Sequence, residues 1–301
     1  MTPVSLDQIR RKIQEMDTIP SIPAIVQPLT ALLRLPPEQV RLDAVLELAS
    51  RDATISAQCL RMANSPLFGR RKTETLRSAV LALGLKRVEG ILLGCCLTRV
   101  VPAEKWAMDA LTFWRHSMGC ALVSQKLAKL IGHPEPEKAY LAGLLHDLGV
   151  LVNTLACTEA FGACLKAAAQ SRVALDVAEQ KHLGFTHCQT GRMLAEQWSF
   201  PGDVTEAIAR HHNVELAATA QDLVSLVHLS DLLCRLRDLG YGYYEAVGVD
   251  LAADPAWTVL LERYPKLAAT DIARLTMDID GAMEDITALV DAVFNPQHSA
   301  A

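Results

Sequence analysis

An adjacent pair of ionisable residues, His146-Asp147, ends an otherwise apolar stretch that begins at Tyr140. Burying ionisable groups costs roughly several kcal/mol unless they are paired or bind a metal ion. Adjacent residues of a helix point about 100° apart, so a histidine and an aspartate on one turn can flank one or two metal ions. The pair is not specific by itself, because a chain of 301 residues can contain one by chance.

Four other histidines and one aspartate also lie within apolar stretches. These residues are His116, His187, His211, His212 and Asp231. Mixed imidazole and carboxylate ligands suit divalent iron, manganese, zinc or nickel, and they differ from the thiolates that hold structural zinc. Together with His146 and Asp147, these residues are candidate ligands for one or two divalent metal ions, provided that the fold brings them together.

Most of these residues also have a purely structural interpretation. The pair His146-Asp147, His116 and Asp231 could form a buried hydrogen-bonded network inherited from an enzyme ancestor. His187 could be a residue that simply begins a helix. The sequence leaves both interpretations open beside metal binding.

The remaining histidines carry weaker expectations. The pair His211-His212 could be cationic and stabilised by the dipole at a helix C-terminus, which would expose at least one of the two to solvent. His182 and His228 are expected to pack in the core or to support ligands. No role is expected for His133, which lies in a turn, or for His298, which lies in the tail.

Helices must position these side chains, because strand signals are almost absent. Apolar residues recur at spacings of three and four in nearly every segment, and aromatic residues make up only 5% of the chain. An all-α fold is therefore expected. Helices are predicted over 42–49, from Asp52, over 79–83 after a Ser78 cap, and over 85–100, 104–131, 137–155, 159–170, 174–182, 187–198, 202–211 and 216–239, with one or two more after Asp254 and Thr270.

Composition narrows the class of protein further. Half of the residues are apolar and 21% are charged, which predicts a packed core. The net charge of −5 gives no electrostatic footprint for nucleic acid or an anionic membrane, so neither is an expected partner. The longest apolar runs, such as 91–97, are too short to cross a bilayer, and residues 1–11 do not resemble a signal peptide. We therefore expect a cytoplasmic protein.

The cysteines and tryptophans are expected to be structural. None of the eight cysteines forms a C-x-x-C pair, and most lie in apolar stretches, as is typical of small buried side chains in a reducing cytosol. Trp114 and Trp198 are expected in the core. The local basic patch Arg70-Arg71-Lys72 is expected in a solvated loop.

The order of the candidate ligands resembles that of a known superfamily. His116, His146-Asp147 and Asp231 resemble the H…HD…D order of the HD superfamily of metal-dependent phosphohydrolases. His187 and His211-His212 resemble the additional ligands of its two-metal members, including the HD-GYP branch. This resemblance implies a metal site for one or two ions.

Further motifs resemble the HDOD branch of this superfamily. They are Ile-Pro-Ser-Ile-Pro at 19–23, Arg-Asp-Ala-Thr-Ile at 51–55, Leu-Arg-Met-Ala-Asn-Ser at 60–65, Ser-Ala-Val-Leu-Ala-Leu-Gly at 78–84, Phe-Trp-Arg-His-Ser at 113–117, Ala-Gly-Leu-Leu-His-Asp-Leu-Gly at 142–149 and Trp-Ser-Phe-Pro at 198–201. The resemblance covers residues 12–240. It implies an HDOD fold, in which an N-terminal helical subdomain packs on an HD-like helical bundle.

A break at Val101-Pro102 suggests how the chain is divided. We expect residues 1–103 to form the N-terminal helical part of the HDOD domain. Residues 104–240 would form the HD-like subdomain, and residues 241–301 a C-terminal helical extension.

Two departures from the HD-GYP pattern bear on activity. HD-GYP enzymes carry a lysine just after the His-Asp-x-Gly stretch, where this chain has Val150. They also follow the paired histidines with glutamate and a Gly-Tyr-Pro stretch, whereas Asn213-Val214-Glu215 stands here. Hydrolysis of cyclic di-GMP is therefore not expected.

The resemblance implies a bacterial signal-transduction or regulatory protein that acts through contacts with signalling partners and binds a metal. The alternative is a metal-dependent phosphohydrolase of the phosphodiesterase or nucleotidase type, with Lys181 or Arg192 in place of the missing lysine. A third possibility is a sensor whose metal binds a small ligand without turnover. No catalytic residue is assigned.

Overall fold

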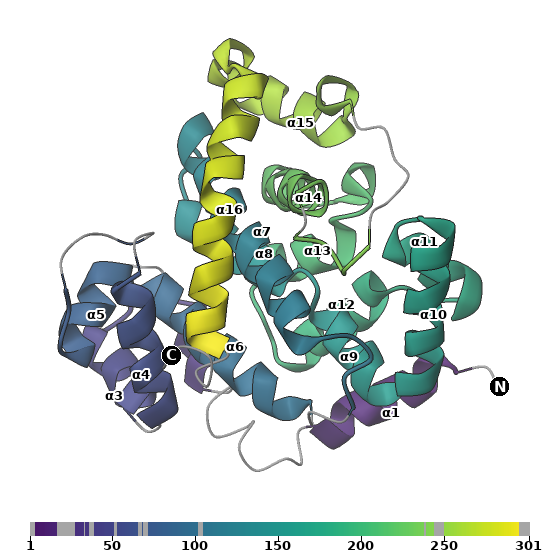
Figure 1. The fold of residues 1–301 in the computed structure, drawn as a ribbon, viewed down its shortest axis with the longest axis horizontal. Coiled ribbons are helices and arrows are strands. Elements are labelled where there is room, and N and C mark those ends of the chain that lie inside the picture. Colours follow the sequence, from purple (N-terminus) through teal and green to yellow (C-terminus); the bar gives the residue numbers. More distant parts are fainter. Residues whose placement is uncertain are drawn as a thin grey trace.

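The regular secondary structure in the described part of the chain is helical throughout in the computed structural model (Figure 1). The structure describes residues 4–16, 28–32, 34–35, 39–50, 53–65, 68, 72–101, 105–237, 239–243 and 250–294. No strand occurs within these ranges, so the predicted all-α class is confirmed. The motif at 19–23 and the residues Arg70, Arg71 and His298 lie outside them, whereas Lys72 is exposed.

The first helices are α1 (Leu6–Met16), α3 (Leu42–Ser50), α4 (Ala53–Ala63), α5 (Leu76–Leu83) and α6 (Leu85–Val100). The central ones are α7 (Ala110–Ile131), α8 (Pro136–Leu145), α9 (Leu148–Ala156), α10 (Thr158–Ser171), α11 (Leu175–His182), α12 (His187–Gln197), α13 (Gly202–Arg210) and α14 (Gln221–Arg235). The last are α15 (Pro255–Arg263) and α16 (Ile272–Phe294), with 3-10 turns η4 (Val214–Leu216), η5 (Leu251–Ala253) and η6 (Pro265–Ala269).

Helix ends follow the local chemistry of the sequence. Asp109 caps α7 by accepting a hydrogen bond from the Leu111 backbone N–H at 3.3 Å, and Gly132 ends this helix in the left-handed region at φ 75°. α5 begins at Leu76 and not after Ser78. Its cap is Thr75, whose side chain accepts from the Ser78 backbone N–H.

The largest difference from the sequence prediction is a break within the predicted helix 137–155. α8 ends at Leu145 and α9 begins at Leu148, so His146 and Asp147 form the junction between them. Asp147 has φ −98° and ψ 22°, a turn conformation outside the helical range. The apolar pattern continues across the junction, and for this reason the break was not predicted.

Packing joins segments that are distant in the sequence. α1 contacts α9 and α12, whereas α16 contacts both α7 and α4 and runs from the α15 end of the molecule towards α6 (Figure 1). Arg115 on α7 pairs with Asp291 on α16 at 2.7 Å. The division into three parts at 103 and 240 remains a prediction.

The core contains the tryptophans that the sequence placed there. Trp114 is 1% exposed and Trp198 is 7% exposed, which confirms both expectations. One stretch, Pro136–Ala156, is long and apolar enough to span a membrane by composition, but 89% of it is buried inside the fold. It comprises α8 and α9, the two helices that carry the His-Asp pair between them.

Candidate metal centre

The fold brings all seven candidate ligands to one place. His116 lies on α7, His146 and Asp147 join α8 to α9, His187 begins α12, His211 and His212 follow α13, and Asp231 lies on α14. Four of the histidines are fully buried, the two aspartates are 2% exposed, and the His212 side chain is 12% exposed. A cluster of ionisable groups this deeply buried requires compensating charge or hydrogen bonds.

Each of the four fully buried histidines has its Nδ1 atom held by an oxygen acceptor. The acceptors are Leu239 O for His116 at 2.5 Å, Gly143 O for His146 at 2.8 Å, Glu179 Oε2 for His187 at 2.6 Å, and Ile208 O for His211 at 3.0 Å. A carbonyl or carboxylate oxygen cannot donate, so Nδ1 carries the proton in each ring. In a neutral ring Nε2 therefore carries the lone pair and can bind a cation, whereas a ring that gains a second proton donates from Nε2 instead.

These Nε2 atoms point at one another. His116 Nε2 lies 3.2 Å from His146 Nε2, and His187 Nε2 lies 3.3 Å from His211 Nε2. His212 Nε2 also lies 3.2 Å from His187 Nε2. Lone pairs that face each other at these distances repel unless a proton or a metal ion lies between them.

The donors fall into two sets. We call His116, His146 and Asp231 the first ion position, where His116 Nε2 lies 3.3 Å from Asp231 Oδ1. We call His187, His211 and His212 the second ion position. In each set the ligand atoms lie within 4.8 Å of one another.

Asp147 connects the two positions through its two carboxylate oxygens. Its Oδ2 atom lies 3.2 Å from His116 Nε2 and 3.0 Å from His146 Nε2. Its Oδ1 atom lies 3.3 Å from His187 Nε2 and 3.6 Å from His211 Nε2. Asp147 would therefore help to hold an ion at either position.

Two glycines allow the helices to approach closely enough for this arrangement. A Cβ atom on Gly143 would lie 2.6 Å from Cys120 O, so α8 packs directly on the backbone of α7. A Cβ atom on Gly149 would lie 1.8 Å from His187 O, so α9 touches the start of α12. Both contacts place a histidine beside Asp147, and a larger residue would separate the elements.

The residues of the centre fit divalent metal ions chemically. Asp231 Oδ2 is buried and accepts no hydrogen bond, although His212 Nδ1 lies 3.7 Å away at ion-pair distance. A cation bound here would supply the missing partner of Asp231 Oδ2 and would also contact the imidazole nitrogens that point inward. Imidazole nitrogens with carboxylate oxygens form the donor set of iron, manganese, zinc and nickel sites.

The pKa values of the histidines differ within the centre. Burial lowers the pKa of His187, but Glu179 and Cys188 outweigh it and raise the pKa well above its usual value. Burial lowers the pKa of His116, but hydrogen bonds to Asp147 and Asp231 outweigh it and raise the pKa to about 10. Burial, followed by repulsion from His146, lowers the pKa of His211 to about 3. Burial and the neighbouring His211 likewise hold the pKa of His212 well below its usual value.

The carboxylates of the centre are ionised. Burial alone would raise the pKa of Asp147, but His146 and hydrogen bonds from His116 and His146 hold it well below its ordinary value. The pKa of Asp231 is also lowered, because Arg235 and His116 outweigh the effect of burial. Two negative charges therefore lie among the imidazoles.

Glu179 supports the second position and was not predicted from the sequence. Its buried Oε2 atom accepts from the His187 ring at 2.6 Å and from the His187 backbone N–H at 2.8 Å. Asn153 donates to Oε1 at 2.9 Å. Glu179 thus fixes the His187 ring and caps the start of α12. Glu179 lies on α11 and His187 begins α12, so spacing within a single helix could not have signalled this contact.

Other contributors were also missed. Arg235 donates from Nε to Asp231 Oδ1 at 2.9 Å, one turn further along α14. Tyr241 donates its phenol hydrogen to Asp147 Oδ2. Cys120 lies 3.7 Å from His116 Nε2 and Cys188 lies 3.8 Å from His211 Nε2. Burial raises the pKa of both thiols, which keeps them protonated at neutral pH in the absence of metal.

The cysteine prediction is otherwise confirmed for the side chains that the structure describes. Six cysteines are free and buried, namely Cys59, Cys120, Cys157, Cys164, Cys188 and Cys234. The side chains of Cys95 and Cys96 lie outside the described set.

Several secondary expectations need correction. His211 is fully buried and His212 is 12% exposed, so neither is a solvated cation at a helix end. His182 is exposed and does not pack in the core. His133 is buried, accepts from the Glu135 backbone N–H at 3.0 Å and therefore has a structural role.

His228 supports a candidate ligand, as expected. Its Nδ1 atom lies 2.5 Å from His211 O, and its Nε2 atom lies 3.1 Å from Asp254 Oδ2. The two cations suggested as replacements for the missing lysine do not serve that role. Lys181 is exposed, and Arg192 pairs with Glu196 at 2.7 Å on an exposed face of α12.

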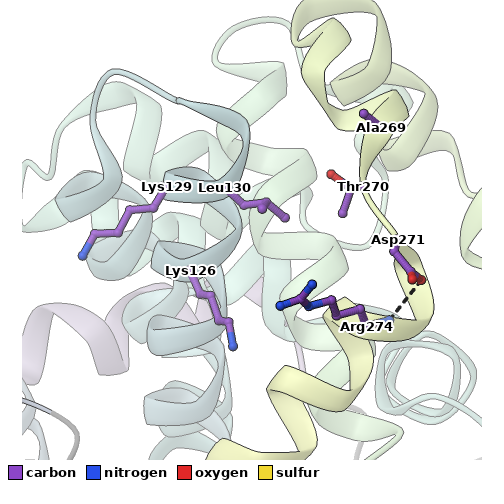
Figure 2. Close-up of a pocket in the computed structure, with 7 residues that line it drawn as sticks. All are labelled: Lys126, Lys129, Leu130, Ala269, Thr270, Asp271 and Arg274. Atoms are coloured by element: carbon purple, nitrogen blue, oxygen red, sulfur yellow. Dashed lines mark hydrogen bonds between the residues drawn. The ribbon is translucent and has the colours of Figure 1, made fainter.

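A separate hollow lies between the C-terminal half of α7 and the start of α16 (Figure 2). It has a volume of about 560 Å³ and is lined by Lys126, Lys129, Leu130, Ala269, Thr270, Asp271 and Arg274. Arg274 extends from α16 towards α7, whereas Lys129 points away from the hollow (Figure 2). We call it the basic groove. Its lining contains none of the candidate metal ligands.

The chain is similar to known proteins in both sequence and fold. A family profile described as the HDOD domain matches residues 19–214. The crystal structure of an HDOD domain protein of unknown function from Geobacter sulfurreducens is 27% identical in sequence. It superposes with a TM-score of 0.79 and covers 96% of this chain and 97% of that one.

Two further solved structures share the fold. A candidate signal transduction protein from Marinobacter aquaeolei VT8 is 21% identical, with a TM-score of 0.72 over 90% of this chain and 59% of that one. A candidate phosphohydrolase from Shewanella amazonensis SB2B is 23% identical, with a TM-score of 0.68 over 93% of this chain and 97% of that one.

One curated relative is similar in sequence. An uncharacterized protein from Treponema pallidum (strain Nichols) is 26% identical over 235 residues, which is 77% of this chain and 45% of that protein. The chain therefore spans less than half of the length of this relative.

Proposed function

The chain belongs to the HDOD domain family, and we propose that it is a bacterial, cytoplasmic signal-transduction protein that holds two divalent metal ions. His116, His146 and Asp231 would bind one ion, and His187, His211 and His212 the other, with Asp147 bridging them. Its output would pass through contacts with protein partners, and the ions would stabilise the conformation that those partners recognise.

One observation carries the metal assignment. Four buried histidines direct their Nε2 atoms inward, while an oxygen acceptor holds each Nδ1 proton. Without metal, protons on Nε2, such as the one that His116 would donate to Asp147 and Asp231, must take the place of the ions. The close approaches of Nε2 to Nε2, such as 3.2 Å between His116 and His146, favour cations in the centre.

The burial of the centre favours a regulatory role over catalytic turnover. The seven candidate ligands are at most 12% exposed, so a substrate has little access to them. Val150, in the position where HD-GYP enzymes have lysine, is fully buried in α9. These features suit two metal ions that stabilise the fold.

The first test is elemental analysis of the protein purified without chelator or histidine tag, beside His146→Ala and Asp147→Ala. The wild type should hold one or two equivalents of metal, and both variants should lose metal, Asp147→Ala the more completely. Glu196→Ala, which removes an exposed carboxylate on α12, is the matched control and should retain metal. A folded wild type without metal would refute the assignment.

A metal-dependent phosphohydrolase is the second candidate, and the geometry of Asp147 favours it. One oxygen of this carboxylate faces each ion position, so that both ions could act on one phosphoester. Divalent ions would supply Lewis-acid polarisation there. Metal-loaded protein should be assayed against phosphomonoesters, phosphodiesters and nucleotides. Turnover that Asp147→Ala abolishes would establish this candidate in place of the regulatory one.

A further inference from the structure

The segment that follows α14 is attached to the metal centre. We call residues 239–243 the strap. Leu239 is 4% exposed, and a Cβ atom on Gly119 would lie 2.7 Å from its Cδ1 atom, so the side chain fills space that this glycine leaves. The carbonyl of Leu239 accepts from His116 Nδ1 at 2.5 Å. One end of the strap therefore sets the orientation of a candidate ligand.

Tyr241 extends this contact into the centre itself. Its phenol donates to Asp147 Oδ2, and its ring centroid lies 4.9 Å from that of His116. Tyr243 then donates to Val173 O at 3.0 Å, which attaches the strap to the α10–α11 connection. The strap is thus held at three points, through Leu239, through Tyr241 beside the first ion position, and through Tyr243.

The hydroxyl of Tyr241 occupies a specific place in the centre. Asp147 Oδ2 is the oxygen that faces His116 and His146 at 3.2 and 3.0 Å. A donor bound to that oxygen lies beside the nitrogen atoms that would bind the first ion. The other donors of this position come from α7, the α8–α9 junction and α14, and each is at most 2% exposed. Tyr241 is only partly buried.

An exogenous ligand of the first ion would compete with this hydroxyl. Divalent ions with carboxylate and imidazole ligands take hard oxyanions such as phosphate at a remaining position. Arg235, which donates to Asp231 at 2.9 Å, adds positive charge next to a ligand of this position. The ligand class that fits is therefore a phosphate or a phosphomonoester.

We propose that Tyr241 closes the first ion position, so that phosphate-type ligands bind the centre only when the strap is displaced. This inference rests on the proposed function, because it requires bound metal. The contact between Tyr241 and Asp147 would then regulate access to the centre. A partner or ligand that displaces Tyr241 would open the centre, and the closed form would otherwise predominate.

The test is the affinity of inorganic phosphate for the metal-loaded full chain, measured by titration calorimetry with metal content determined on the same samples. Tyr241→Ala should bind phosphate about tenfold or more tightly than the wild type, since the population of the open form limits apparent affinity. Tyr241→Phe keeps the ring over His116 and should show a smaller gain. Tyr264→Phe removes a similar phenol–carboxylate bond, to Asp222 at 2.8 Å outside the centre, and should match the wild type.

The possible outcomes distinguish the inference about Tyr241 from the proposed metal-binding function. A gain in phosphate affinity in Tyr241→Ala that disappears on chelation supports the inference, whereas a gain that survives chelation does not depend on the metal ions and refutes it. Equal affinity in the wild type and both Tyr241 variants, with metal present in all, overturns the inference alone. Absence of metal from every sample overturns the proposed function and the inference together.

Discussion

The two ion positions differ in their charge although they share Asp147. The first combines two imidazoles with Asp231, and His116 there has its pKa raised to about 10 by hydrogen bonds to two carboxylates. The second combines three imidazoles, of which His211 has its pKa lowered to about 3. Without metal, a proton would occupy the first position on His116. In the second position burial lowers the pKa of His187, but Glu179 and Cys188 outweigh it and raise the pKa well above its usual value, whereas His211 stays neutral. The first position thus holds its proton between two carboxylates, and the second places a protonated ring beside neutral ones.

The largest expected effect is the loss of both ions. Each ion at about 100 times its Kd stabilises the fold by about 2.7 kcal/mol, and a large domain shifts by roughly 2–4 °C per kcal/mol, so chelation should lower Tm by on the order of 10 °C. Scanning calorimetry with and without EDTA measures the shift. Asp147→Ala should show no further change with EDTA. An unchanged Tm in chelated wild type would mean that neither position contributes to stability.

Single substitutions should separate the positions. Asp231→Asn removes the charge specific to the first position, and His212→Ala removes the most exposed imidazole of the second, with its side chain 12% exposed. Each variant should retain about one equivalent of metal, with the larger loss of affinity in Asp231→Asn because a carboxylate is lost. Titration of metal-free protein with Mn²⁺ measures both stoichiometry and affinity. Loss of both ions from His212→Ala would show that the positions are not separable.

The sequence predicted the helices better than it predicted the centre. The period of the apolar residues is enough to place α6, whose bounds match the predicted 85–100. It cannot show the break at His146 and Asp147, because apolar residues continue through it and the turn is set by contacts with α7 and α12. The candidate ligands could be named because ionisable residues are rare in apolar helices.

The supporting residues could not be predicted in the same way. Glu179 and Tyr241 contact the centre from α11 and from the strap, and no spacing relates them to His187 or Asp147. Leu239 contributes a backbone carbonyl, which any residue type would provide. Contacts of this kind depend on tertiary packing alone.

Glu179→Gln should weaken the second position and leave the first one unchanged. The amide can still accept from Asn153, but it loses the charge that Glu179 Oε2 presents to the His187 ring at 2.6 Å. Removing such a supporting carboxylate typically costs about 10–100-fold in metal affinity. Competition with a chromogenic chelator measures the two dissociation constants. Glu196→Gln, an exposed glutamate on α12, is the control. Equal weakening of both positions would contradict the separation.

The smallest expected effect is the pH dependence of the metal-free protein. The pKa of His116 is raised to about 10 from an ordinary 6.5, so its contribution to stability is complete below about 6.5 and is lost as pH rises towards 10. The pKa of His211 is lowered to about 3, so its contribution is complete above 6.5 and is lost as pH falls. Tm of chelated protein should therefore fall on both sides of neutrality, at high pH through His116 together with His187, whose pKa is also raised, and at low pH through His211.

Asp231→Asn tests which position causes the alkaline decline. Removing this carboxylate takes away one of the two partners that raise the pKa of His116, so the decline above pH 7 should become shallower. His212→Ala leaves both partners of His116 in place and should keep the slope of the wild type. Thermal unfolding in EDTA between pH 5 and 9 measures all three proteins. The same alkaline slope in wild type and Asp231→Asn would mean that the first position holds no proton in the absence of metal, and the contrast between the two positions would then be lost.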